Sequence, residues 1–131
     1  MERNEKTRAL LAAFGCALAY LLAGKALTAV LPQVPGEAAR MWAFVHRCAA
    51  APIVEELVFR GIIQQLARPL GERQAVALQA VLFAVQHRGP AGMVYALVCG
   101  LVLGTLRSRT GSVWPGMLLH TLNNLLVFAA G

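Results

Sequence analysis

Residues 9–31 read ALLAAFGCALAYLLAGKALTAVL, a run that is apolar apart from Thr28 and the single charge of Lys25. A transmembrane helix needs about 20 consecutive, mostly apolar residues, so this run is long enough to cross a bilayer. A short basic segment precedes it, and this order also fits a signal peptide. The length of the run, and Lys25 near its end, favour a first membrane helix that is retained.

The composition of the whole chain agrees with a membrane protein. Of its 131 residues, 58% are hydrophobic and only 14% are charged, and the mean hydropathy is +0.61. A soluble domain carries roughly 25% charged residues, so too few polar side chains are present here to cover a surface in water. The apolar content also excludes a disordered chain. The length allows one domain, over residues 1–131.

Four further apolar segments follow the first, at residues 40–66, 74–87, 91–106 and 113–130. The last three are shorter than a full crossing, so they need flanking residues, a tilt or a locally thinner bilayer. The sequence therefore predicts an all-α, polytopic transmembrane bundle of about five membrane helices, with a core at residues 40–130.

The basic residues lie between the apolar segments rather than along one stripe. This pattern argues against nucleic-acid binding despite the net charge of +6. With a cytoplasmic N-terminus, the predicted inner segments hold seven basic residues and the outer ones hold two, which agrees with the positive-inside rule. The seven are Arg3, Lys6, Arg8, Arg68, Arg73, Arg107 and Arg109, and the two are Arg40 and Arg88.

Ionisable side chains inside a membrane are costly and usually mark a function. On a helix, residues four apart share a face, so Glu56 and Arg60 can form an ion pair. Glu55 lies on an adjoining face without that partner, which leaves its carboxylate free to act as a general base. Pro52, one turn earlier, is a position where the helix can restart. The complete set of candidate residues is Glu55, Glu56, Arg60, His87, His120 and Asn124.

His120 and Asn124 are also four apart, so both side chains project from one face of the last segment. Together they can donate two hydrogen bonds to one oxygen, as an oxyanion site requires. His87 ends the third segment. Three segments thus supply a carboxylate, an imidazole and a pair of donors, a set able to activate water and stabilise the tetrahedral intermediate of peptide hydrolysis.

These motifs resemble the CPBP family of intramembrane proteases, which includes CAAX prenyl proteases and bacteriocin-processing enzymes and is also called the Abi family. Glu55 to Arg60 fits EExxxR, Phe83 to His87 fits FxxxH, and His120 to Asn124 fits HxxxN, in that order on successive apolar segments. The stretch TGSVWP at residues 110–115 is also similar to the family. The resemblance covers about residues 48–128.

The resemblance implies a glutamate-dependent protease that uses no metal and no other cofactor. By motif position, Glu55 activates the water, and His87 helps to bind or polarise it. His120 and Asn124 form the oxyanion hole.

Glu56 and Arg60 would hold the motif helix, with Glu56 able to assist more directly. The chain is short for the family and is similar to its small bacterial forms, some of which act on C-terminal sorting tails. We therefore expect a protein of the bacterial inner membrane that cleaves a peptide bond near the C-terminus of a membrane-associated or exported protein. A prenylated substrate stays open, as does the oligomeric state.

Two other functions also fit the same residues. His87, His120 and a glutamate would make an acceptable zinc site with water as the fourth ligand, although the sequence contains no HExxH motif. A non-catalytic membrane protein, either an immunity or scaffold factor or a small proton-coupled carrier, would also place Glu and His in a membrane.

Several small or polar residues are expected to serve packing. Asn123 is predicted to be a helix-packing amide. Four glycines are expected to allow close helix approach: Gly61, Gly100, Gly104 and Gly116.

Overall fold

The computed structural model describes residues 2–30 and 35–131, and every regular element in those ranges is a helix. The predicted all-α bundle is confirmed for this part of the chain. Leu31, the last residue of the predicted first segment, lies outside it. The elements are α1 (Glu2–Val30), α2 (Gly36–Val45), η1 (His46–Ala50), α3 (Ala51–Glu55), η2 (Glu56–Ile63), α4 (Gln64–Leu66), η3 (Arg68–Leu70), α5 (Glu72–Ala84), α6 (Gly89–Thr110) and α7 (Trp114–Ala129).

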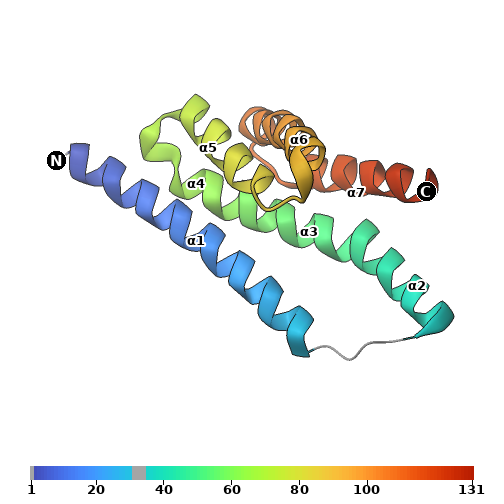
Figure 1. The fold of residues 1–131 in the computed structure, drawn as a ribbon. Coiled ribbons are helices and arrows are strands. Elements are labelled where there is room, and N and C mark those ends of the chain that lie inside the picture. Colours follow the sequence, from blue (N-terminus) through green and yellow to red (C-terminus); the bar gives the residue numbers. More distant parts are fainter. Residues whose placement is uncertain (1, 31–34) are drawn as a thin grey trace.

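The elements from α2 to α4 follow one helical path across the molecule (Figure 1). In this view α1 runs below the path, and α5, α6 and α7 lie above it. α1 packs on η2, α4 and α5, while α7 packs on η1 and α3. The long path therefore contacts helices on both of its sides, and its two glutamates lie in the middle of the bundle.

The interior of the bundle combines an apolar core around Phe59, Ile63 and Phe83 with several buried polar side chains, and large apolar side chains cover much of the outside. An apolar outer surface is the one expected for a bundle surrounded by lipid. The buried polar residues are Glu56, Arg60, Gln64, Gln79 and His120. The exposed apolar residues include Leu11, Leu18 and Leu22 on α1, Val94, Val98 and Val102 on α6, and Leu118, Leu122 and Leu126 on α7.

Two of the described helices, α1 and α6, are long and apolar enough to cross a membrane. The fourth predicted segment, 91–106, was expected to be too short, but α6 extends it to Gly89–Thr110. The helix continues through Arg107 and Arg109 and ends where Gly111 adopts a left-handed conformation, with φ +69°. The total of about five membrane helices stays a prediction.

Pro52 does not interrupt the second predicted segment. The chain is helical on both sides of it, and η1, just before it, is a π-helical turn. The Ala51 N–H donates to the His46 carbonyl, five residues earlier. In an α-helix the proline ring would clash with the carbonyl of Cys48, four residues before it. The wider turn relieves this clash, so the helix passes Pro52 without restarting.

α5 and α6 form an antiparallel pair whose close approach depends on glycine. A Cβ atom at Gly100 would lie 2.9 Å from Ala80, and one at Gly104 would collide with the Gln79 amide. At Gly116 the added atom would lie 2.7 Å from a Glu56 carboxylate oxygen. The prediction of close approach is confirmed at these three positions. It is wrong at Gly61, where the nearest atoms are 3.8 Å away, an ordinary contact distance.

Candidate active site

Glu56 lies at the centre of the buried polar cluster, in the π-helical segment η2. Its Oε1 accepts a hydrogen bond from His120 Nδ1 at 2.9 Å and pairs with Arg60 Nη1 at 3.1 Å. Both members of the Glu56–Arg60 pair are fully buried, so the predicted ion pair is present inside the bundle. The absence of a side chain at Gly116 gives the carboxylate its room beside α7.

Glu55 approaches the same imidazole from the other ring nitrogen. Its Oε2 lies 3.5 Å from His120 Nε2, beyond the usual length of an N–H···O hydrogen bond. The Glu55 side chain is 19% exposed, whereas that of Glu56 is 0% exposed. Neighbouring residues on one helix therefore reach two edges of one ring, and only Glu55 has access to the surface.

Phe83 connects the three motifs through its ring. The Arg60 guanidinium carbon lies 4.6 Å from the Phe83 ring centroid, a cation–π distance. The rings of His87 and His120 meet the same phenyl ring edge-on, at centroid distances of 4.6 Å and 5.9 Å. The phenylalanine of FxxxH thus packs against residues from both other motifs, a role that the sequence did not predict.

His87 lies just past the end of α5, which stops at Ala84 rather than at residue 87 as predicted. Its Nδ1 lies 3.0 Å from the Phe83 carbonyl oxygen. Because a carbonyl only accepts, Nδ1 carries the proton, and Nε2 is the ring atom left for a water or a substrate.

His120 and Asn124 have different partners within the chain, and the substrate oxygen that the sequence predicts them to share stays a prediction. His120 faces the two carboxylates, and Asn124 Nδ2 donates to the backbone carbonyl of Arg47 at 2.8 Å. The HxxxN helix is therefore held at two points on the glutamate helix, one at Glu56 and one at Arg47.

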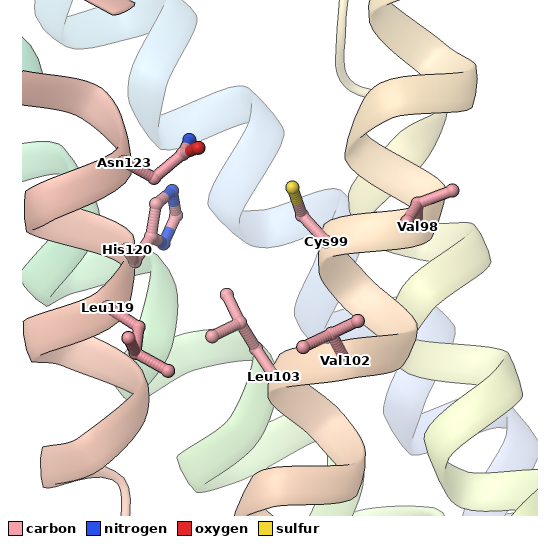
Figure 2. Close-up of a pocket in the computed structure, with 7 residues that line it drawn as sticks. All are labelled: Val98, Cys99, Val102, Leu103, Leu119, His120 and Asn123. Carbon is pink, nitrogen blue, oxygen red and sulfur yellow. The ribbon is translucent and has the colours of Figure 1, made fainter. Parts of the chain in front are cut away.

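A cavity of about 180 Å³ lies between α6 and α7 and reaches His120. Figure 2 shows Leu119, His120 and Asn123 on α7 facing Cys99 and Leu103 on α6 across this space. Val98 and Val102 complete an apolar lining.

A zinc site would need the two histidines and a glutamate to converge. Among residues 2–30 and 35–131, no three His, Cys, Asp or Glu side chains form a group that could hold a metal ion. Both ring nitrogens of His120 face carboxylates instead. The zinc alternative therefore finds no ligand set in the described part of the chain.

The sequence analysis also missed the polar contacts around Asn124. The Tyr95 hydroxyl donates to Asn123 Oδ1, and Asn123 Nδ2 donates to Asn124 Oδ1 at 3.4 Å. Asn123, predicted to be a packing amide, thus links α6 to Asn124. For the contact between Asn124 and the Arg47 carbonyl, the sequence offered one signal, Pro52. A proline inside a helix leaves a carbonyl of the preceding turn without its donor, so a donor from another helix can bind there.

The model of the type II CAAX prenyl endopeptidase Rce1-like family matches residues 37–126, which is more than half of the chain. The chain belongs to this family. It is therefore a membrane-embedded peptide hydrolase of the CAAX endopeptidase type, and all three motifs lie inside the matched range. A search of curated proteins and a search of solved structures gave no match.

Proposed function

We propose that this endopeptidase hydrolyses a peptide bond with a water molecule activated by Glu55. The observation that supports this best is His120, which lies with Nδ1 on Glu56 and Nε2 towards Glu55. This arrangement gives the two adjacent glutamates different tasks. Glu56 is buried and paired, and it orients the imidazole. Glu55 is partly exposed and remains available to a water molecule.

The proposed mechanism requires the imidazolium form of His120, in which both ring nitrogens carry a proton. With Glu55 and Glu56 as carboxylates and Arg60 as a guanidinium, this form makes the cluster neutral, and a neutral cluster is less costly in a membrane interior than a charged one. In that state Nδ1–H donates to Glu56, and Nε2–H is ready to donate to a second oxygen.

The proposed reaction has two steps. In the first, the water oxygen attacks the carbonyl carbon of the scissile bond while Glu55 accepts the water proton, and the carbonyl oxygen becomes an oxyanion. His120 Nε2–H donates to this oxyanion. In the second, the intermediate collapses, the C–N bond breaks, and the proton on Glu55 passes to the leaving amine. Glu55 then returns to the carboxylate form.

His87 and Asn124 assist in this scheme. His87 has Nδ1 on the Phe83 carbonyl, so Nε2 can accept a hydrogen bond from the attacking water and orient it. One hydrogen of the Asn124 amide is donated to the Arg47 carbonyl. The second hydrogen of its NH₂ group is the donor proposed for the oxyanion.

We propose that the substrate is a membrane-associated or exported protein cleaved near its C-terminus. The exposed apolar surface of the bundle keeps the site in the bilayer, so the substrate must reach it as a segment held at the membrane. The seven-to-two distribution of basic residues supports a cytoplasmic N-terminus. The bacterial inner membrane is the proposed location, and the substrate and the lipid bilayer are the proposed partners.

The test uses the protein purified into lipid nanodiscs and a library of C-terminal peptides, each made with and without a lipid anchor. Mass spectrometry identifies cleaved products and ¹⁸O incorporation from labelled water. The wild type should cleave members of the library, and Glu55→Gln should not. Glu72→Gln is the matched control, because Glu72 is an exposed glutamate at the start of α5. Equal cleavage by wild type and Glu55→Gln would refute the glutamate mechanism, and no cleavage by the wild type would favour the non-catalytic alternative.

A further inference from the structure

The carbonyl of Arg47 has no partner in its own helix. In the π-helical turn before Pro52 the Ala51 N–H bonds the His46 carbonyl. The next donor in that register, five residues after Arg47, would be the N–H of residue 52, and proline has none. An unpaired carbonyl in an apolar segment is costly, because lipid offers no hydrogen bond.

Asn124 supplies the missing donor from another helix. Its Nδ2 lies 2.8 Å from the Arg47 carbonyl oxygen, and the Cys48 thiol donates to the Asn124 carbonyl at 3.8 Å. One turn further along, the rings of Phe44 and Phe128 pack edge-on at 5.4 Å. The C-terminal half of α7 is thus attached to the segment just before the two glutamates.

The Asn124 side chain is fixed at its other end as well. Its Oδ1 accepts from Asn123 Nδ2, and Asn123 Oδ1 accepts from the Tyr95 hydroxyl. The donors all run in one direction, from Tyr95 on α6 through two amides of α7 to the Arg47 carbonyl. Because the Asn124 Oδ1 accepts one hydrogen bond and its Nδ2 donates another, the amide group is held in one orientation. The second N–H of Nδ2 therefore points in a fixed direction.

We propose that Pro52 and Asn124 act together. Pro52 leaves the Arg47 carbonyl without a donor in its own helix, and this carbonyl then binds the Asn124 amide and fixes its position. Asn124 then joins α7 to the glutamate helix and keeps His120, one turn away, against Glu55 and Glu56. The consequence for catalysis rests on the function proposed above. The consequence for stability does not.

A double-mutant cycle tests the pair through the unfolding temperature of the protein in detergent. Asn124→Ala should lower Tm by about 3–6 °C, because it leaves the Arg47 carbonyl unpaired. In the Pro52→Ala background residue 52 has an N–H for that carbonyl, so the same Asn124→Ala change should cost less than half as much. Gln79→Leu is the control. It removes an amide that donates to a different helix at the Gly100 carbonyl, so its cost should be equal in both backgrounds.

The activity of Pro52→Ala shows whether the Arg47 carbonyl positions Asn124 for catalysis or only stabilises the fold. The new N–H competes for the Arg47 carbonyl and releases Asn124, so kcat should fall about tenfold with KM and Tm maintained.

Two outcomes would overturn the proposal. One is an Asn124→Ala cost in Tm that is the same in both backgrounds, and the other is an unchanged kcat in folded Pro52→Ala. If Pro52→Ala does not fold, Asn124→Leu decides, because it keeps the volume and removes the donor. A Leu variant as stable as the wild type would overturn the proposal too. Cleavage that survives Glu55→Gln would refute the glutamate mechanism and leave the Tm cycle intact.

Discussion

Two buried polar clusters in this bundle use their polar atoms in different ways. Gln64 and Gln79 are neutral, and their Nε2 groups donate to the α6 backbone, at the Gly104 carbonyl at 3.0 Å and the Gly100 carbonyl at 2.7 Å respectively. The cluster of Glu56, Arg60 and His120 is ionisable and connects side chains to side chains. The amide cluster joins helices, whereas the charged cluster can exchange protons.

The charged cluster is also less completely paired. In the described part of the chain, Glu56 Oε2 and all three Arg60 nitrogens are buried without a hydrogen-bond partner, and in the amide cluster the same holds for Gln64 Oε1 and Gln79 Oε1. Such groups cost free energy that the fold must recover elsewhere, and they are retained at functional sites. Both clusters are buried, so burial alone does not distinguish them. The proposed function assigns the reaction to the charged cluster because its groups can change charge next to the partly exposed Glu55 carboxylate.

Replacing the accessible carboxylate should give the largest effect. Glu55→Gln should lower kcat by about 10²–10⁴-fold, since the amide cannot accept the proton of water. Tm should stay near the wild-type value, because Glu55 is 3.5 Å from His120 and partly exposed, so little native pairing is lost. Peptide cleavage and thermal unfolding are measured on the same preparation. A loss of both in parallel would mean that Glu55 serves the fold instead.

The neighbouring glutamate should behave in the opposite way. Glu56→Gln leaves Arg60 charged, buried and without its partner, which typically costs about 3–5 kcal/mol in the free energy of unfolding. The activity should fall as well, because His120 loses its orienting acceptor. Chemical denaturation in detergent micelles measures the loss.

A second substitution separates the two contributions of Glu56. Arg60→Met in the Glu56→Gln background removes the unpaired charge, so most of the stability should return while the activity does not. Recovery of both would show that Glu56 acts only through the ion pair. It would remove the orienting role proposed for this carboxylate.

The sequence predicted the helical class and the Glu56–Arg60 pair, because periodicity and spacing act within one helix. The three motifs came from the resemblance to the family. It did not predict the partners between helices. Among these partners is the Arg47 carbonyl, to which Asn124 donates. The oxyanion that His120 and Asn124 are expected to share belongs to a substrate, so that expectation stays a prediction. Spacing along one helix carries no information about a carbonyl on another.

Around the amide cluster, the stability of the protein should depend on how closely α5 and α6 pack, and not on charge. Gly100→Ala would place a Cβ atom 2.9 Å from Ala80, so α5 and α6 must separate, at a cost of about 1–3 kcal/mol. Gly61→Ala is the control, because its Cβ atom would have 3.8 Å to its nearest neighbours. The cleavage rate per folded molecule should be unchanged in both variants. Because alanine is the better helix former, Gly61→Ala should be at least as stable as the wild type. A Gly61→Ala variant as unstable as Gly100→Ala would show that the contact with Ala80 does not decide the cost.

Removing metal ions should give the smallest effect, namely none. The positive charge beside the Glu56 carboxylate comes from the Arg60 guanidinium, 3.1 Å from Oε1. Among residues 2–30 and 35–131, no three His, Cys, Asp or Glu side chains are grouped to hold a metal ion. Incubation of the purified protein with a strong chelator should therefore leave the cleavage rate as it was. If the chelator abolishes cleavage and zinc restores it, the charged cluster must rearrange around a metal, and Glu55 would be a ligand or a partner of metal-bound water instead of the base.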